Sequence, residues 1–422
     1  MPESVVADPA LAPEGEARIG WAEGQMPVLR SIRARFAEER PLDGIAVAAC
    51  LHVTAETAVL ARTLQVGGAR VALCAANPLA TQDDVAAALA ADGATTVRAV
   101  RGEGPDAYAR HVAALAGSGP DVTLDDGADL VGLMHVAYPD AAAALRGSTE
   151  ETTTGLLRLR TMEAEGRLLV PVVAANEAHT ERAFNDRYGT GQSTLDGILR
   201  TTNLLLAGRT LVVLGYGWTG RGVAQRARGA GASVIVCEVD PLRALEARME
   251  GYEVMPAIEA AERGEVFVTV TGSRGVLRRE HFERMPDGAV LANAGHFDVE
   301  IAREDLLDMA EGRVREIRPL VEEFELDGRR LNLLARGRVV NLAAAEGHPA
   351  SVMDLSFAVH ALAVEELVRG TKRLAPGVHP VPAHIDRAIA RLKLESLGVE
   401  IDALRADQEE YQRNWAPGAG PR

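Results

Sequence analysis

Short apolar runs alternate with amphipathic stretches from about residue 45 onward. The runs GIAVAACLHV and ARVALCAANP have the length and composition of buried strands, and TAETAVLARTLQVGG between them has the spacing of a helix that ends at glycines. A second series of the same kind begins near Gly208. Strands that alternate with helices form parallel sheets flanked by helices. The pattern predicts an α/β protein with two Rossmann-like, doubly wound domains around a cleft.

The two series also predict the domain boundaries. We expect a first domain in residues 1–185, completed by residues 348–378, and a second domain in residues 190–347. The stretch HPASVMDLSFAVHALAVEELV predicts a long helix that crosses back to the first domain. Residues 379–422 form a charged C-terminal helical segment that suits contacts between subunits, and residues 1 to about 15 are expected to be a loose tail.

Composition excludes several classes of protein. The 422 residues carry a formal net charge of −15, whereas nucleic-acid binding requires a basic face. The cysteines Cys50, Cys74 and Cys237 lie in apolar runs without the spacing of a zinc site or a disulfide framework. The N-terminus lacks the layout of a secretion signal, and no apolar run approaches the ~18 residues of a membrane span. We therefore expect a cytoplasmic protein with no metal and no membrane partner.

A glycine-rich turn predicts a dinucleotide site. Gly215, Gly217 and Gly220 follow a predicted strand and open a predicted helix, and Glu238 ends the next strand. This spacing suits a pyrophosphate at the helix N-terminus and a carboxylate on the ribose hydroxyls. A carboxylate there repels a 2′-phosphate, so it selects NAD over NADP. It should outweigh the nearby Arg221, which by itself would favour NADP. The alternative is a glycine turn without a ligand.

Titratable residues gather where the strands and loops are predicted to end. His52, His296 and His348 each have small neighbours that would admit a ligand. The pairs Asp125–Asp126 and Glu150–Glu151 suit acid–base chemistry. They suit helix starts equally well, because Ser148-Thr149-Glu150-Glu151 has the form of a capping box. From the residues alone, both interpretations stay open.

The chain resembles the S-adenosylhomocysteine hydrolase family, in its prokaryotic and archaeal branch. The resemblance runs almost the whole length, in order, through LHVTAET, LDDGADL, GSTEETTTG, YGTGQSTLDGI, GYGWTGRG, NAGHFDVEI and NLAAAEGHPASVMDLSF. It implies that the first domain binds an adenine nucleoside, that the second binds NAD, and that four copies assemble as a dimer of dimers. It also implies that NAD oxidises the ribose 3′-hydroxyl transiently, with no net redox change.

The resemblance assigns roles to particular residues. Asp126 matches the base that removes the C4′ proton, and His52 and His296 match the acid–base pair for the 5′ leaving group and water. Glu151 matches a further active-site carboxylate. The substrate-binding positions that the resemblance implies are Thr54, Glu56 and His348, with Thr54 and Glu56 at the adenine. The implied NAD contacts, besides the glycines of the turn, are Thr152, Thr153, Thr154, Glu238 and Asn341.

One segment departs from the family pattern. Glu181 stands where the family has a catalytic Lys, and Asn185-Asp186 replaces Asp-Asn, at positions that hold the ribose hydroxyls. A buried unpaired carboxylate is costly, so Glu181 must be protonated, paired or turned outward. Asp186 is a candidate to take over the lost contact. A second departure is Val359-His360, where the family has Asn-Gln.

These departures leave three hypotheses. The first is an enzyme that acts on an adenine nucleoside with an altered sugar, eliminates water to leave an exocyclic alkene, and serves nucleoside-antibiotic metabolism. The second is an ordinary hydrolase that forms adenosine and homocysteine. The third is an NAD-binding regulatory pseudoenzyme, against which the intact set of titratable residues argues.

Overall fold

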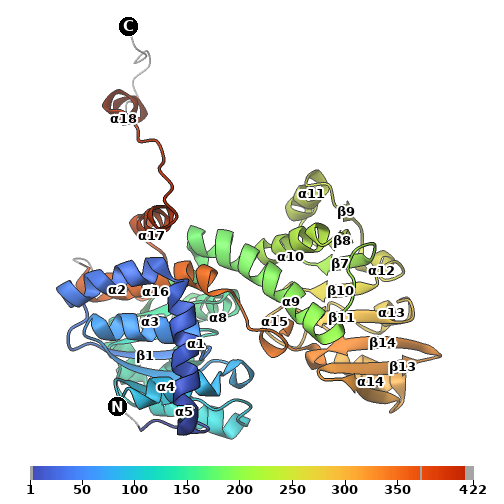
Figure 1. The fold of residues 1–422 in the computed structure, drawn as a ribbon, viewed down its shortest axis with the longest axis horizontal. Helices are drawn as coiled ribbons and strands as arrows, with labels where there is room; N and C mark the ends of the chain where they lie inside the picture. The colour runs from blue at the N-terminus through green and yellow to red at the C-terminus, as the bar shows by residue number, and fades with distance from the viewer. Residues whose placement is uncertain (1–2, 371–372, 414–422) are drawn as a thin grey trace.

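Two α/β domains lie side by side in the computed structural model, which describes residues 3–370 and 373–413 (Figure 1). Each domain is built on its own sheet, and the chain passes between them twice. The predicted α/β class with two doubly wound domains is confirmed.

The first domain contains a parallel sheet in the order β15-β6-β5-β4-β1-β2-β3. Its inner strand β1 is buried along its whole length, because apolar residues face helices on both sides of the sheet. The strands are β1 (Ala46–Leu51), β2 (Arg70–Ala75), β3 (Thr95–Arg98), β4 (Val122–Asp125), β5 (Gly147–Glu150), β6 (Pro171–Ala174) and β15 (Gly377–Pro380).

Helices cover both faces of this sheet. One apolar core lies beneath α1 (Ala12–Gly24), α2 (Pro27–Glu39), α3 (Ala55–Val66), α4 (Asp83–Ala91) and α16 (Ala350–Arg369). A second core lies beneath α5 (Pro105–Ala116), α6 (Asp129–Ala137), α7 (Pro139–Ala144) and α8 (Thr153–Ala164). Helix α16 comes from the end of the chain, and so returns to the first domain as the sequence predicts.

The second domain contains a sheet in the order β12-β13-β14-β11-β10-β7-β8-β9. It is parallel except for the β12, β13 and β14 edge, which is antiparallel. The strands are β7 (Thr210–Leu214), β8 (Ser233–Cys237), β9 (Glu253–Val254), β10 (Val266–Thr269), β11 (Ala289–Asn293), β12 (Val314–Arg318), β13 (Val321–Leu326) and β14 (Arg329–Leu334). The helices are α9 (Thr190–Thr202), α10 (Trp218–Gly229), α11 (Pro241–Met249), α12 (Ala257–Ala260), α13 (Arg279–Phe282), α14 (Arg303–Ala310) and α15 (Val340–Ala343).

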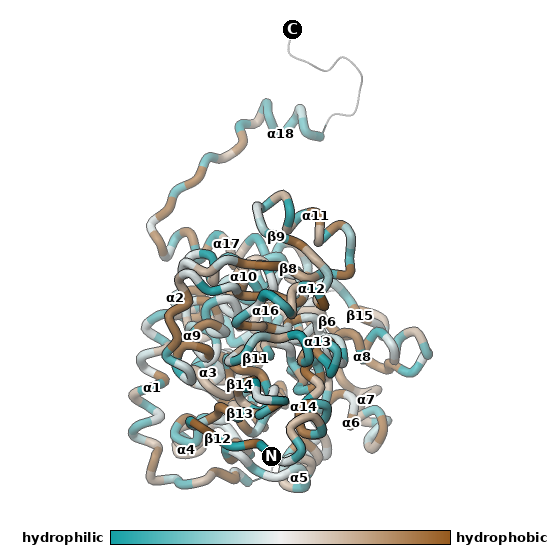
Figure 2. Tube along the Cα trace, turned by 90° about the vertical axis from the view of Figure 1, so that its right-hand side faces the viewer, coloured by the Kyte–Doolittle hydropathy of each residue, from teal (hydrophilic) through white to brown (hydrophobic). Residues whose placement is uncertain are grey.

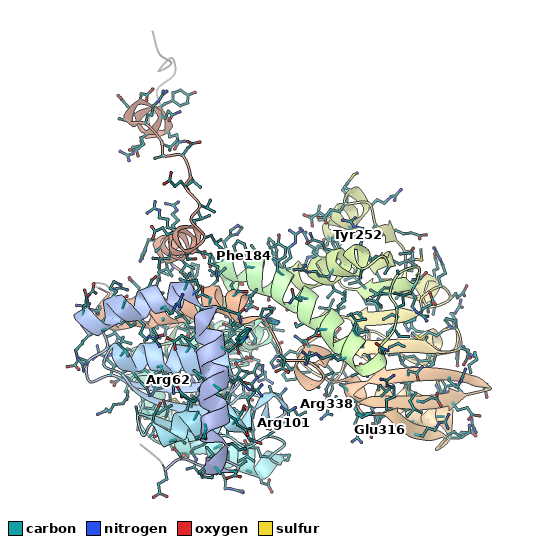
Figure 3. The ribbon with its side chains drawn as sticks, viewed as in Figure 1. Arg62, Arg101, Phe184, Tyr252, Glu316 and Arg338 are labelled. Atoms are coloured by element: carbon teal, nitrogen blue, oxygen red, sulfur yellow. The ribbon has the colours of Figure 1, made fainter. Side chains whose placement is uncertain are left out.

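The passage from the first domain to the second is a π-helical segment, η4 (Glu181–Gly189), which runs directly into α9. A π-helix is rare and is found mostly at functional sites, because its wider turn changes which side chains share a face. Phe184, labelled in Figure 3, marks this segment at the start of the connection between the domains. The whole sequence segment that departs from the family pattern is therefore structurally unusual as well.

From residue 3 onward the N-terminal region is ordered, so the prediction of a loose tail is wrong for the described residues. Val5 joins the edge of the first sheet, with its amide 2.7 Å from the Val97 carbonyl oxygen and its carbonyl oxygen 3.0 Å from the Ala99 amide. Helix α1 packs on α4, where a Cβ at Gly15 would lie 1.9 Å from the Asp84 carbonyl oxygen. Glycine at position 15 allows this close contact.

The capping box that the sequence left open at Ser148 is not formed. Ser148, Thr149 and Glu150 are strand residues of β5, and Thr152 caps α8 instead, its hydroxyl accepting from the Gly155 amide at 3.1 Å. The short sequence pattern fits either arrangement, and pairing with β4 and β6 decides for the strand.

The C-terminal segment leaves the body of the protein. It consists of α17 (Ala383–Ser396), which packs on α16 and α2, and α18 (Ala406–Arg413), which lies far from both domains (Figures 1 and 2). The segment from Leu397 to Leu404 is not helical. Within the described residues, no helix is long and apolar enough to cross a membrane.

Candidate active site

A cavity of ≈ 1630 Å³ lies between the two domains, at the carboxyl ends of both sheets. Ligands bind at this edge of doubly wound sheets. Of the residues that the sequence nominates, all except Asp125, Glu150 and Gly220 line it: His52, Thr54, Glu56, Asp126, Glu151, Thr152, Thr153, Thr154, Glu181, Asn185, Asp186, Gly215, Gly217, Glu238, His296, Asn341 and His348. Segments far apart in the sequence therefore share one site.

The three glycines of the turn after β7 have three different roles. Gly215 has a φ of +106°, which side chains disfavour. A Cβ at Gly220 would lie 2.0 Å from the Gly215 carbonyl oxygen, so Gly220 lets helix α10 pack closely and faces the protein, not the cavity. A Cβ at Gly217 would meet only Arg243 Nη1, at 3.8 Å. The backbone at Gly217 is thus open to a pyrophosphate at the start of α10, as a dinucleotide requires.

Glu238 ends β8 as a fixed carboxylate. Its Oε2 accepts from the Tyr216 amide at 2.6 Å, and its Oε1 accepts from the amides of Val239 at 2.7 Å and Asp240 at 3.1 Å. Three amide donors hold it in the position for a ribose diol. Arg221, the residue that favoured NADP, instead pairs with Glu246 and lies 5.6 Å over the Trp218 ring. The donor set therefore fits NAD.

The remaining predicted cofactor contacts lie at two places on the cavity wall. Thr152 donates its hydroxyl to Glu150 at 2.8 Å, and the Thr153 hydroxyl donates to the Asn176 Oδ1 at 3.0 Å. Asn341 donates through Nδ2 to Ser193 at 3.3 Å. Its Oδ1 is buried without a partner among the described residues, which leaves an acceptor for a ligand.

His52, Asp126 and His296 meet in the cavity. His52 follows β1, and its Nε2 lies 3.2 Å from the Asp126 Oδ2 after β4. His296 follows β11 in the other domain, and a Cβ at Gly127 would lie 3.6 Å from its Nε2. Burial lowers the pKa of His296, and the Asp126 charge opposes this only in part. The two domains thus bring two imidazoles and one carboxylate together.

Arg158 links this group of residues across the domain boundary, and no sequence pattern points to it. From α8 it donates to the Gly127 carbonyl oxygen at 2.8 Å and to Asp129 at 2.9 Å. Its guanidinium also lies 5.3 Å over the ring of Phe297, the residue after His296. A cation over an aromatic ring is attracted to its face. Arg158 therefore helps to hold the His296 loop against the first domain.

His348 is half-buried and forms a hydrogen bond within the protein. Its Nε2 lies 3.0 Å from the Thr190 hydroxyl, and burial lowers its pKa to about 4. It is therefore neutral near pH 7 and suited to hydrogen bonding. Glu56 lies in the first turn of α3, next to the cap Thr54, and burial raises its pKa. Both His348 and Glu56 line the cavity.

The two carboxylate pairs each divide into a structural and a cavity-facing residue. Asp125 accepts from the amides of Leu130 and Val131, each at 2.9 Å, and burial raises its pKa to about 8. Glu150 accepts from the Gly127 amide at 2.8 Å, and burial raises its pKa as well. Asp126 and Glu151 instead line the cavity. Both interpretations left open by the sequence are therefore needed, one for each member of a pair.

Glu181 points inward and is 1% exposed. Its Oε1 accepts from Asn185 Nδ2, and its Oε2 is buried without a partner among the described residues. Burial raises the pKa of Glu181 well above its ordinary value, and the charges of Glu151 and Asp186 raise it further. Burial, followed by the Glu151 charge, also raises the pKa of Asp186 to about 7. Of the three fates open to Glu181, the structure favours a protonated, hydrogen-bonded acid.

The second departure from the family pattern lies directly behind the first. His360 on α16 is fully buried, with Nε2 2.5 Å from the Glu151 Oε2 and Nδ1 2.6 Å from the Thr149 hydroxyl. Ser356, one turn earlier, donates to the Glu151 Oε1 at 2.6 Å. Asn185 donates to the same Oε1 at 3.3 Å. The substitutions at positions 181, 185 and 360 thus belong to one hydrogen-bonded cluster.

Two protein-family models match the chain. One, described as S-adenosyl-L-homocysteine hydrolase, matches residues 3–138, and the other, its NAD binding domain, matches residues 186–347. An adenosylhomocysteinase of Aquifex aeolicus is 58% identical over 98% of this chain and 99% of its own length. The chain belongs to the adenosylhomocysteinase family. Its second domain binds NAD, as the family model and the donor set described above agree.

Two further comparisons extend this. A protein of Methanopyrus kandleri named S-inosyl-L-homocysteine hydrolase is 52% identical over 99% of this chain and 98% of its own length. The names of these two relatives thus refer to nucleosides with two different bases, adenosine and inosine. Among solved structures, a dipicolinate synthase of Bacillus halodurans superposes with a TM-score of 0.50 at 13% identity, over 78% of this chain and 99% of that one, which shows the fold alone.

Replacing Glu181 tests its protonation. A carboxyl whose pKa is raised by folding stabilises the folded protein at pH values below the pKa it has in the unfolded chain. This stabilisation is lost as the pH rises through the pKa of the folded protein. The free energy of unfolding of Glu181→Gln should therefore equal that of the wild type near pH 4.5 and exceed it by on the order of 1 kcal/mol at about pH 8. Chemical denaturation across pH measures the difference.

Glu177→Gln is the control from the same segment. Burial opposes ionisation of Glu177, but its ion pairs with Arg160 and Arg182 win and lower its pKa. Its contribution is present above the unfolded pKa and lost on acidification, so Glu177→Gln should lose stability at neutral pH and not at acid pH. The same sign for both variants would contradict the assignment at Glu181.

Proposed function

We propose that this protein oxidises a sugar hydroxyl of an adenine nucleoside transiently and eliminates the nucleoside's 5′ substituent, with no net redox change. The observation that carries this proposal is the pairing of an intact His52–Asp126–His296 group with a rebuilt cluster at Glu181. The first matches the elimination chemistry of the adenosylhomocysteinase family, and the second is the end of the cavity where the family holds the ribose.

The residues divide the work as follows. Asp126 removes the C4′ proton once the neighbouring carbon is a ketone, because an adjacent carbonyl stabilises the resulting enolate. His52 lies 3.2 Å from Asp126, and His296 is kept neutral by burial, so one imidazole can donate a proton to the leaving group while the other accepts one. Glu56 and Thr54 hold the adenine, and His348 hydrogen-bonds within the site.

Bound NAD supplies a hydride acceptor at the start of the cycle and returns the hydride at its end. The protein's part is to hold it. Glu238 binds the ribose diol, the backbone at Gly217 receives the pyrophosphate, and Thr152, Thr153, Thr154 and Asn341 complete the contacts. Because the cavity spans both domains, the nucleoside and the cofactor share one enclosed space.

Two leaving groups are in contention, and different observations favour each. The names of the relatives favour homocysteine, as in an ordinary adenosylhomocysteinase, and support this better than any other leaving group. The cluster at Glu181 favours a different sugar, because it puts a neutral acid and an amide where the family has a Lys and an Asp. We propose for that sugar the loss of water, which would leave an exocyclic alkene of the kind found in nucleoside antibiotics.

A purely regulatory role has less support. A protein without catalysis has no need for His52, Asp126, Glu151 and His296 in one enclosed cavity, since burying ionisable groups costs free energy.

Product analysis by mass spectrometry separates the two leaving groups. The NAD-loaded protein should convert an adenine nucleoside with a free primary hydroxyl into a product lighter by one water, and leave adenosylhomocysteine unchanged. The matched variant restores the family residues as E181K/N185D/D186N/H360Q and should gain hydrolysis of adenosylhomocysteine. Adenosine and homocysteine released by the wild type at the rate of that variant would contradict the dehydratase and establish the hydrolase.

We also propose that four copies assemble through the C-terminal segment. Leu397, Val399, Ile401 and Leu404 are between 46% and 69% exposed on a stretch that leaves the body of the chain (Figure 2). Exposed apolar side chains in series are typical of interfaces.

Truncation after Ser396 tests the assembly. The full chain should have four times the mass of one chain in native mass spectrometry, and the truncated chain should be smaller than a tetramer while keeping its helical content. A tetramer that survives truncation would mean that the interface lies elsewhere.

A further inference from the structure

The cluster behind the cavity has a chemistry that the proposed function leaves unused. Glu151 receives two donors at Oε1, Ser356 and Asn185, and its Oε2 lies 2.5 Å from the His360 Nε2, which is an acceptor when the imidazole hydrogen is on Nδ1. Hydrogen bonds from donors favour the ionised form of a carboxylate. Glu181, on the other side of Asn185, is in the opposite situation, because burial and the neighbouring charges favour its neutral form. Glu151 thus accepts hydrogen bonds from neighbouring donors, whereas Glu181 holds a proton of its own.

Only Glu151 among these groups has a second proton carrier behind it. His360 does not line the cavity, and its side chain is fully buried between the Thr149 hydroxyl and Glu151. The Glu151 side chain is 10% exposed and does line the cavity. A proton taken up by Glu151 from the cavity can therefore be shared with an imidazole that lies away from substrate. Histidine is the side chain best suited to this near neutral pH.

The charges around the pair come from three elements. Glu181, Arg182 and Asp186 face it from η4, and Glu151 itself follows β5. On α16, Asp354 is held by Lys393 at 3.0 Å and by the amides of Val28 and Leu29, away from the cavity. Arg182 pairs with Glu177 at 2.8 Å. Among the described residues, His360 is consequently the basic group that directly contacts Glu151.

We infer that Glu151 is the base that takes the proton of the sugar hydroxyl during oxidation, and that His360 is the positioning residue that orients Glu151 and shares its proton. In this step the O–H bond of the hydroxyl breaks and its electron pair forms the carbonyl. The hydride leaves the carbon for NAD, and the proton passes to Glu151. The pair takes the place of the Lys that the family uses at position 181. The inference rests on the proposed function, because it assumes that a sugar hydroxyl is oxidised.

His360→Gln tests the inference, with Ser356→Ala as the matched control. The Gln amide can keep both hydrogen bonds but cannot carry a second proton, whereas Ser356→Ala removes one donor to the same carboxylate and leaves the imidazole. With adenosine as the probe, His360→Gln should lower kcat for NADH formation ~10- to 100-fold, leave KM within about threefold and shift the acidic limb of the pH profile. Ser356→Ala should shift the profile less than His360→Gln, because it removes one donor and leaves the imidazole in place.

A binding measurement adds a readout that needs no turnover. Adenosine is titrated by calorimetry into NADH-loaded protein in two buffers of different ionisation enthalpy, which counts the protons exchanged on binding. The count should differ from the wild type in His360→Gln and not in Ser356→Ala. If the wild type forms no NADH with any nucleoside, the proposed function fails, while this count still decides whether the pair holds a mobile proton.

Three results would overturn the inference. The first is that His360→Gln keeps the pH profile and the proton count of the wild type. The second is that Ser356→Ala shifts both quantities by as much as His360→Gln does. If His360→Gln does not fold, Thr149→Val and Thr149→Ser replace it, because only the first removes the hydroxyl at His360 Nδ1. Thr149→Val should shift the profile and Thr149→Ser should restore it. Identical profiles for these two variants are the third contradictory result.

Discussion

The site depends on one constraint, which is that the carboxylates buried between the domains must be satisfied without a lysine. Glu151 does this by accepting from Ser356 on α16 and from Asn185 on η4, and by pairing with His360 on α16. It thereby ties the end of strand β5 to the helix that returns from the second domain and to the segment that leads into it. Truncating one member of such a network leaves its partners unpaired, at a cost of about 1–3 kcal/mol each. The residues at 181, 185 and 360 therefore depend on one another for their hydrogen-bond partners.

The fold provides the setting in which this cluster can act. Two parallel sheets present their carboxyl ends to one cavity, and the chain crosses between the domains at η4, which runs into α9, and again between α15 and α16. The His296 loop and the Glu238 carboxylate come from the second domain, and His52, Asp126 and Glu151 come from the first. Arg158 reaches the ring of Phe297 from the first domain and joins the two halves. Because no half of the site is complete alone, the chemistry depends on how the domains meet.

Much of this was predictable from local pattern. The strand and helix periods indicated the two domains, and the glycine turn with Glu238 indicated the dinucleotide site, because these features depend on neighbours in the sequence. The order of the N-terminal residues was not predictable, since Val5 pairs with β3 more than 90 residues later. The cluster was only half predictable. Glu181 and His360 each stood out as departures, but their connection through Glu151 and Asn185 exists only in three dimensions, and Ser356 and Arg158 had no sequence signal.

The central claim is that the rebuilt cluster leaves the elimination chemistry intact, and exchange at C4′ tests it most directly. The NAD-loaded protein is incubated with an adenine nucleoside in deuterium oxide, and the recovered nucleoside is examined by mass spectrometry and NMR. If the sugar is oxidised and Asp126 removes the C4′ proton reversibly, one deuterium should appear at C4′, and Asp126→Asn should abolish it. A nucleoside that forms NADH but returns without deuterium at C4′ would show oxidation without elimination chemistry and would contradict the account.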